Sequence, residues 1–412
     1  MRTMQIDLFS NVQQAYARGP VSNDDLYQGL VRNGTLERSE LDEQQKVGRL
    51  GAVHRCTKRK VRWVQQTLKQ MGILESTGAR GRWQLTDEGK RGLTPAPVRR
   101  ILLGFSTTLG VALWASCSDV FARLDQPIAL CLTSPPYPLA APRAYGNPNE
   151  AQFVDWICAM LEPIVKNLMP GGSIALNVSN DIFLSKSPAR SLYRERMVLA
   201  LHDRLGLYKM DEIVWHNPCK PPGPMQWASK QRFQLNVAWE PVYWFTNDPL
   251  LVRSNNQRVL EPHTDKHLAH VRKGGSNTKR VNGDGSNRVR LGAYSQETAG
   301  RIPRNLMSIR HNCRDQALYK AHCDQAGLPR HGASMPLALA SKLVEFLTEP
   351  DDLVVDPFGG SFTTGKACEL LGRRWLSTEL MGEYVAGGAS RFQSAEGFET
   401  NFQERHYGTA PQ

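Results

Sequence analysis

Two short segments, roughly 220 residues apart, carry the residue types in this chain that are best suited to chemistry. The first is Ser134-Pro135-Pro136-Tyr137, which closes the apolar run Ile128 to Thr133. Successive prolines fix φ and remove N–H donors, so this loop presents carbonyl oxygens and the Ser134 hydroxyl. Such acceptors suit an exocyclic amino group on a nucleobase, and Tyr137 offers a face for stacking an extruded base. Taken alone, the segment is more typical of a proline-stiffened turn at the end of a strand.

The second segment is Asp356-Pro357-Phe358-Gly359-Gly360-Ser361. It follows the short strand predicted at 352–356 and precedes a helix predicted at 363–371, so backbone N–H groups can approach a ligand closely. A further predicted strand, 374–379, ends in Glu379, whose carboxylate can accept hydrogen bonds from two ribose hydroxyls. A glycine pair after a strand does not by itself distinguish S-adenosylmethionine (SAM) from NAD or from a site without a ligand.

Together and in this order, the two segments resemble the catalytic and SAM loops of β-class DNA amino-methyltransferases of type II restriction–modification systems. Within this family, Ser-Pro-Pro-Tyr is typical of cytosine-N4 enzymes, whereas adenine-N6 enzymes usually carry Asp or Asn at the first position. The resemblance covers roughly residues 110 to 392. Further matches are Tyr145-Gly-Asn147, Val154-Asp-Trp156, Pro170-Gly-Gly-Ser173, Trp215-His-Asn-Pro218, Pro221 to Trp227, Ile302 to Leu306, His331 to Pro336 and Leu347 to Asp356.

The resemblance implies a role for each matching residue. The residues that would hold and orient the target cytosine are Ser134, Pro135, Pro136 and Tyr137. Those that would bind SAM are Asp356, Phe358, Gly359, Gly360, Ser361 and Glu379, with Ser334 and Pro336 beside the methionine moiety. Trp215, Asn217 and Pro218 would shape the target-base pocket. Two positions depart from the family pattern: Phe362 replaces a glycine, and Ser116-Cys117 replaces a Gly-Asp pair.

Composition indicates a globular protein with a polyanionic partner. The chain has 412 residues, 41% hydrophobic and 22% charged, with a net charge of +12, which favours nucleic acid. No apolar run approaches the ~20 residues of a membrane helix, and the start lacks the apolar core of a signal peptide, so we expect a cytoplasmic location without membrane contact. Eight cysteines occur without a CxxC pair, and His311, Cys313, His322 and Cys323 fit no common zinc spacing, so no metal is expected.

The elements that must position these residues fall into an N-terminal unit and an α/β unit. Residues 1–95 predict a winged-helix-like domain, with helices at 7–18, 24–31 and about 51–71 followed by a hairpin from 72 to 86. The third helix is basic, and DNA contact is expected from Arg55, Lys58, Arg59, Lys60 and Arg62. A solvated helix face or a protein-contact module is the alternative.

Beyond a proline-containing linker at 96–110, apolar strands alternate with helices, which predicts a Rossmann-like sheet. We expect a catalytic part at 111–247, a target-recognition region at 248–330 and a SAM-binding part at 331–412. The stretch 248–304 is polar, glycine-rich and basic, and DNA contacts are expected there from Lys273, Lys279 and Arg280.

The sequence therefore predicts a SAM-dependent enzyme that methylates cytosine N4 in a short sequence of double-stranded DNA and is paired functionally with a restriction endonuclease. Two alternatives stay open at this point: adenine-N6 methylation, and a DNA-binding regulator whose methyltransferase fold is inactive.

Overall fold

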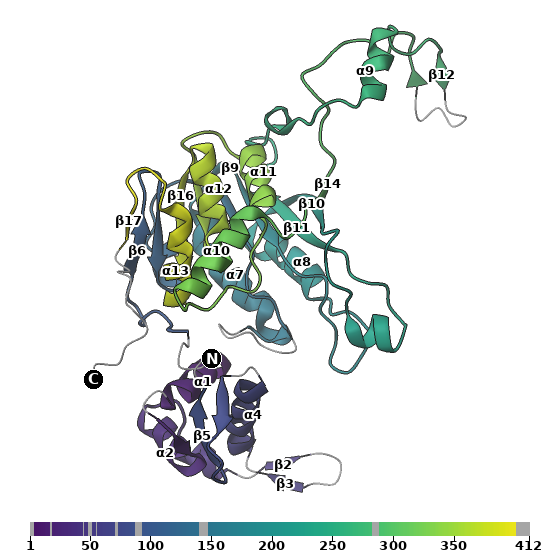
Figure 1. Ribbon diagram of the computed structural model, residues 1–412. Coiled ribbons are helices and arrows are strands. Elements are labelled where there is room, and N and C mark those ends of the chain that lie inside the picture. Colours follow the sequence, from purple (N-terminus) through teal and green to yellow (C-terminus); the bar gives the residue numbers. More distant parts are fainter. Residues whose placement is uncertain are drawn as a thin grey trace.

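A ten-stranded mixed sheet organises most of the chain. The computed structural model describes residues 4–16, 19–43, 45–47, 52–54, 56–70, 73–86, 93–139, 147–281 and 288–400 (Figure 1). From one edge to the other the strands are β14 (Leu306–Ser308), β10 (Tyr208–His216), β11 (Trp239–Thr246), β9 (Leu168–Asn177), β8 (Ile128–Thr133), β15 (Leu353–Asp356), β16 (Arg374–Glu379), β7 (Gly110–Trp114), β6 (Leu102–Ser106) and β17 (Glu399–Thr400).

The centre of this sheet is parallel. β9, β8, β15, β16 and β7 run in one direction, and β10 shares that direction because it is antiparallel to β11, which is itself antiparallel to β9. β8 and β15 are buried along their whole length, as expected for strands covered on both faces. The carboxyl ends of these strands therefore meet at one edge of the sheet, which we call the carboxyl edge.

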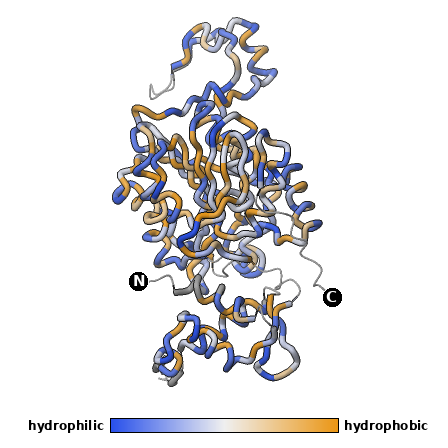
Figure 2. Tube along the Cα trace, turned by 90° about the vertical axis from the view of Figure 1, so that its left-hand side faces the viewer, coloured by the Kyte–Doolittle hydropathy of each residue, from blue (hydrophilic) through white to orange (hydrophobic). Residues whose placement is uncertain are grey.

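Helices cover both faces of the sheet. One face packs against α6 (Cys117–Phe121), α7 (Glu150–Lys166) and α8 (Tyr193–Leu205), and the other against α11 (Leu337–Leu347), α12 (Thr363–Leu371) and α13 (Gly382–Ala389), with α10 (Arg314–Gln325) packed on α13. The hydrophobic residues concentrate along the sheet between these layers (Figure 2). The predicted Rossmann-like fold is confirmed. No helix in the described part of the chain is both long and apolar enough to cross a membrane.

The N-terminal domain has a core of its own, built from residues such as Val12, Leu26, Leu30, Val64 and Leu68. Its elements are α1 (Met4–Ala15), β1 (Val21–Ser22), α2 (Asn23–Arg32), α3 (Arg38–Asp42), β2 (Gln45–Val47), β3 (Ala52–His54), α4 (Cys56–Gln70), β4 (Leu74–Ser76) and β5 (Arg82–Leu85). Strands β1, β5 and β4 form a small sheet beside α1, α2 and α4, which is the winged-helix arrangement that the sequence predicts.

Two N-terminal predictions need correction. The helix predicted at about 51–71 is α4, which begins at Cys56 and not near residue 51, because 52–54 pair with 45–47 as a hairpin; the short helix α3 before it was not predicted. The linker expected at 96–110 is wrong for 102–106, which form β6 and pair with β7 and β17. Apolar residues there complete the edge of the sheet, whereas the prolines that suggested a linker lie just upstream.

Residues 94–96 are already part of the methyltransferase unit. The Ala96 N–H donates to the Leu380 carbonyl at 2.7 Å, the Gly382 N–H donates to the Thr94 carbonyl at 2.9 Å, and Pro95 bridges Met381. The Thr94 N–H and hydroxyl both donate to the Glu383 carboxylate, at 2.6 and 2.7 Å. This short segment, which we call the latch (94–96), ties the end of the N-terminal domain to the segment that follows β16.

The basic segment after β11 leaves the sheet at the end opposite the carboxyl edge. It contains η2 (Asn256–Val259), α9 (Asp265–Arg272) and a small hairpin of β12 (Arg280–Val281) and β13 (Arg288–Val289). A bridge between Glu261 and Arg301 closes its base, and the part beyond that bridge, from 262 to 300, is called the arm. Both views place the arm and the N-terminal domain at opposite ends of the molecule (Figures 1 and 2).

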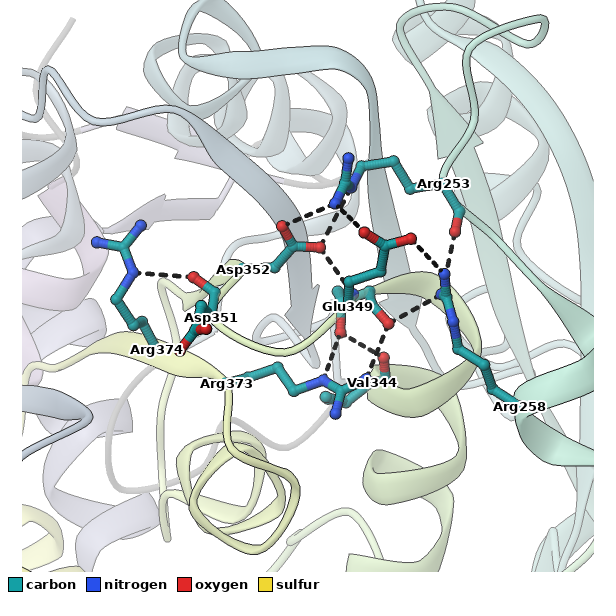
Figure 3. A network of polar contacts seen from close by, with 9 residues as sticks. Arg253, Arg258, Val344, Glu349, Asp351, Asp352, Arg373 and Arg374 are labelled. Carbon is teal, nitrogen blue, oxygen red and sulfur yellow. Dashed lines mark hydrogen bonds and ion pairs between the residues drawn. The ribbon is translucent and has the colours of Figure 1, made fainter.

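The root of the arm is fixed by a network of polar contacts (Figure 3). Arg253 donates to Glu349 and Asp352, and Arg258 donates to Glu349 and to the Thr348 carbonyl. Arg373, directly before β16, also donates to the Thr348 carbonyl. These contacts lie at the amino ends of β15 and β16, so the arm starts far from the loops that follow the strands.

Candidate active site

One cavity at the carboxyl edge brings the two predicted loops together. Its lining includes Ser134, Pro135, Pro136 and Tyr137 from the loop after β8, Phe358 from the loop after β15, and Glu379 from the end of β16. These strands are next to one another in the sheet, although the loops are more than 200 residues apart in sequence. The strand order therefore turns two distant motifs into one site.

A buried hydrogen bond joins the two loops. The Thr133 hydroxyl, just before Ser134, donates to Asp356 Oδ1 at 2.6 Å, and the Phe358 N–H donates to the same oxygen at 3.1 Å. Burial raises the pKa of Asp356 to about 6, although these donors and Thr364 lower it. Asp356 thus connects the loop after β8 to the loop after β15 by hydrogen bonds. It does not itself line the cavity, whereas the next two residues, Pro357 and Phe358, do.

Glu379 has the surroundings expected of a ribose-binding carboxylate. Gly360 N–H donates to its Oε2 at 2.8 Å and Met381 N–H to its Oε1 at 2.9 Å. Each oxygen keeps further acceptor capacity for a hydroxyl of a ligand. Burial raises the pKa of Glu379 to about 7, and the charge of Asp356 acts in the same direction.

The glycine turn fits closely around this carboxylate. Gly360 has φ +53°, and a Cβ there would lie 3.0 Å from the His331 ring, which also lines the cavity. A Cβ on Gly359 would lie 3.1 Å from the ring of Phe362. Side chains at either position would therefore crowd the turn that presents the Gly360 N–H.

Phe362, the departure from the family glycine, points away from the cavity. It keeps the left-handed backbone usual for glycine, with φ +59° and ψ 37°. Its ring is fully buried in the core, 5.1 Å from the ring of Phe105 and against Gly388. The substitution therefore leaves the ligand side of the turn unobstructed.

Flat apolar side chains complete the cavity. The rings of Trp156 (from α7) and Phe358 have centroids 5.3 Å apart, and both line the wall. Cys117, the second departure, also lines it, and burial raises the pKa of its thiol to about 12, so the thiol is neutral. A carboxylate for a diol and flat walls for an adenine together fit SAM, which Glu379 and Phe358 would hold.

A second set of residues supports the SAM loop from α10, and the sequence analysis missed it. Arg391, almost fully buried, forms an ion pair with Asp315 and donates to the Ser361 carbonyl at 2.6 Å and to Thr363 Oγ1 at 2.8 Å. The Ser361 hydroxyl donates to Ser334 at 2.7 Å. Ser334 and Pro336, predicted to contact SAM, thus lie beside the loop, with Ser334 bonded to it and Pro336 capping α11. No local pattern marks Arg391, because its partners come from distant segments.

The residues predicted to shape the target-base pocket do not line the described cavity. Trp215 is buried, donates its indole N–H to the Ile309 carbonyl at 2.9 Å and stacks on His311. Asn217 Oδ1 accepts from the N–H of Cys219 at 3.1 Å, and Pro218 is exposed. All three lie at the end of β10, three strands from β8 in the sheet.

The predicted DNA-contacting residues fall into two groups. Lys58, Arg59, Lys60 and Arg62 lie on α4, where Lys58 sits over the Tyr27 ring and Arg62 donates to the Tyr27 hydroxyl; Arg55 lies outside the described residues. Lys273, Lys279 and Arg280 lie on the arm, which the structure does not bring to the catalytic loop. Across the described ranges, no three His, Cys, Asp or Glu side chains come together as a metal site.

Comparison with known proteins agrees with this geometry. A family model described as DNA methylase matches residues 128–390, and one described as Mrr N-terminal domain matches residues 7–94. Over 271 residues, the chain is 34% identical to the type II methyltransferase M.PvuII of Proteus hauseri, covering 65% of this chain and 79% of that protein. It is 25% identical over 264 residues to the type II methyltransferase M.BglII of Bacillus subtilis, covering 63% and 62%.

A solved structure titled PvuII DNA methyltransferase (cytosine-N4-specific) shares the fold with a TM-score of 0.54 at 30% identity, covering 73% of this chain and 90% of that one. The family match spans well over half of the chain and contains both cavity loops. The chain therefore belongs to the DNA methylase family and is a DNA methyltransferase that uses SAM.

Proposed function

We propose that this enzyme transfers the methyl group of SAM to the N4 amino group of cytosine within a short sequence of duplex DNA. The observation that carries the proposal is the shared cavity of Ser134-Pro-Pro-Tyr137, Phe358 and Glu379. The relative with 34% identity over most of its length has a solved structure named cytosine-N4-specific, which supports the choice of base.

The loop supplies acceptors rather than a covalent nucleophile. The amino nitrogen of cytosine is a poor nucleophile, because its lone pair is delocalised into the ring. If the Ser134 hydroxyl and a proline carbonyl accept its two N–H bonds, the nitrogen becomes tetrahedral and its lone pair is free to attack. Bound SAM supplies an electrophilic methyl group on a sulfonium. The nitrogen–methyl bond forms as the sulfur–methyl bond breaks, and the amino nitrogen then loses one of its two protons to water. The remaining work is positioning, and no enzyme-bound intermediate is needed.

The position of the loop supports transfer to an extruded base. Pro135 is buried, and Ser134 and Tyr137 are only partly exposed in the cavity wall. An amino group stacked inside a duplex cannot enter such a cavity, so the cytosine would rotate out of the helix and stack on Tyr137.

Mass spectrometry of nucleosides tests the reaction. DNA incubated with the enzyme and methyl-labelled SAM should contain labelled N4-methylcytosine, and sequencing of that DNA then locates the target site. Labelled N6-methyladenine would replace the proposal with the adenine alternative. Absence of label under conditions where SAM and DNA both bind would favour the inactive-regulator alternative.

Ser134→Ala tests the role of the loop. We expect turnover to fall by about 100-fold or more, the order of magnitude for losing one well-placed hydrogen bond to the reacting group. SAM affinity, measured by calorimetry, should change by less than about threefold, because ~0.6 kcal/mol or less is expected for a residue that touches only the base. Unimpaired turnover would remove Ser134 from the mechanism.

The biological role that we propose is protection of DNA from a partner nuclease. The support is the similarity to two proteins named type II methyltransferases. Co-expression with a nuclease that cuts the site found by sequencing would test it: protected plasmid DNA is expected, and cleavage despite full methylation would exclude this role.

A further inference from the structure

The segment between β10 and β11, residues 217–238, forms a lobe that projects beyond the carboxyl edge (Figure 1). We call it the β10–β11 lobe. β10 is the third strand along from β8, and neighbouring strands are ~4.8 Å apart, so the base of the lobe lies about 14 Å from the end of β8. This separation is close to the ~12 Å width of a DNA major groove. A duplex that offers a base to Ser134 is therefore wide enough to reach the lobe as well.

Backbone hydrogen bonds hold the lobe in one conformation. Asn217 N–H donates to the Ala238 carbonyl and Val237 N–H to the Gly223 carbonyl, both at 2.8 Å. The Trp227 carbonyl accepts from two N–H groups near the tip, those of Phe233 and Gln234. The Gln234 side chain donates to the Pro188 carbonyl at 3.1 Å, which fixes the lobe to the loop after β9.

This ordered lobe exposes large apolar side chains to water. Leu235 is 88% exposed, Phe233 66% and Met225 59%. Residues 217–238 contain three basic residues and no acidic one, and Lys230 and Arg232 are both exposed. Three large apolar side chains exposed on one short ordered segment are suited to a contact site, and the basic residues of the same segment match a phosphate backbone.

We infer that the β10–β11 lobe enters the duplex next to the target base and that Phe233 and Leu235 fill the space which the extruded cytosine leaves. This inference rests on the proposed function. Proteins that open a base step commonly insert apolar side chains between bases, and this offsets an unstacking cost of a few kcal/mol. Lys230 and Arg232 would hold the neighbouring phosphates while the apolar tip occupies the gap.

The test compares a paired with an unpaired target. Once sequencing has located a methylated site, two short duplexes are made, one with the target cytosine paired and one with it mispaired. For the double variant Phe233→Ser/Leu235→Ser, kcat/KM on the paired duplex should fall by about tenfold or more. On the mispaired duplex it should stay within about threefold of wild type, because that base is already free to leave the helix.

Leu250→Ser is the matched control, since Leu250 is 92% exposed but follows β11 at the opposite end of the sheet. It should behave like wild type on both duplexes. A 2-aminopurine beside the target gives a readout besides turnover: its fluorescence should rise on binding of wild type and rise much less with the double variant.

Three results would overturn the inference. The double variant could match Leu250→Ser on both duplexes, or lose activity equally on both, or keep full activity while its assembly state in solution changes, which would make the lobe a contact between copies. A wild-type enzyme that methylates no DNA would instead contradict the proposed function.

Discussion

At the scale of single residues, Phe362 stands where the family pattern has a glycine, and it keeps the left-handed backbone conformation that favours glycine. A left-handed conformation costs a non-glycine residue about 1–2 kcal/mol, and the buried ring compensates by filling the core between Phe105 and Gly388. A Cβ on Gly388 would lie 2.4 Å from this ring, so the two positions depend on each other.

Substitutions at the two positions should therefore couple. Phe362→Gly is expected to lower the free energy of unfolding by about 3 kcal/mol, because the cavity outweighs the relief of backbone strain. Gly388→Ala alone should also destabilise, but in the Phe362→Gly background it should cost little, since its methyl group enters the vacated space. Denaturant unfolding of the four proteins measures the coupling. Additive effects would mean that the core collapses around the cavity instead.

If Glu379 holds the ribose as proposed, SAM binding should depend on pH. Burial raises the pKa of its carboxyl to about 7 from an ordinary 4.5, whereas ribose hydroxyls donate to the ionised form. SAM affinity should therefore fall towards tenfold per pH unit below about 7, and Glu379→Gln should flatten the profile. Calorimetric titrations between pH 5.5 and 8.5 measure this pH dependence.

Asp356→Asn should move the midpoint of the SAM-affinity profile to lower pH, because the charge of Asp356 helps to raise the pKa of Glu379. A pH-independent affinity in wild type would exclude Glu379 from ribose binding.

The raised pKa of Glu379 affects the stability of the SAM-free protein in the opposite direction, so that stability falls as pH rises. The folded state holds the Glu379 proton up to about pH 7, whereas an unfolded glutamate releases it near 4.5. The stability that this group contributes is complete below 4.5 and is lost as pH rises to about 7. SAM-free enzyme should accordingly lose stability over the range in which SAM affinity increases.

At the scale of elements, the sequence predicted the strands next to the chemistry almost to the residue. Ile128–Thr133, Arg374–Glu379 and the helix Thr363–Leu371 were predicted with the bounds that the structure shows, because buried parallel strands are continuous apolar runs that end in turn residues. The predictions failed for two different reasons. Residues 102–106 pair locally with β7, but the prolines just upstream indicated a linker and hid this strand. The Arg391–Asp315 ion pair has no local signal, because its two residues come from distant segments of the chain.

Because of the latch, the effect of removing the N-terminal domain should depend on whether the deletion ends before or after residues 94–96. A boundary after residue 95 would cut through a segment that donates to Glu383 and is hydrogen-bonded to 380–382, next to Glu379. Deleting residues 1–86 should weaken DNA binding and leave SAM affinity unchanged, since 94–96 stay in place. Deleting residues 1–97 should in addition weaken SAM affinity, by about tenfold if one or two buried hydrogen bonds of ~1 kcal/mol each are lost.

Calorimetry with SAM and anisotropy with labelled DNA separate these effects. Equal SAM affinity in the two truncated proteins would show that the latch does not support the cofactor site. If DNA affinity and its salt dependence are unchanged after removal of 1–86, the winged-helix domain is a protein-contact module, which was the alternative.

At the scale of the whole molecule, the carboxyl edge of the sheet and the arm lie at opposite ends of the methyltransferase unit. The latch attaches the N-terminal domain beside the active site, and the β10–β11 lobe projects from the same edge, whereas the arm starts at the amino ends of the strands (Figure 1). A duplex that reaches Ser134 can lie along the first two elements. Lys273, Lys279 and Arg280 would touch that duplex only beyond the far end of the sheet.

Removing the arm tests this division of the molecule directly. Glu261 and Arg301 already pair with each other, so a short glycine–serine turn can replace 262–300 and leave the root contacts of Arg253 and Arg258 intact. The deleted stretch has seven basic and three acidic residues, a net charge of +4. If specificity resides at the carboxyl edge, the shortened enzyme should methylate the same sites at a similar rate, and only the salt dependence of DNA binding should become less steep. Sequencing of methylated DNA and a salt titration measure both. Methylation that spreads to new sites would assign target recognition to the arm and require it to swing towards the catalytic loop when DNA binds.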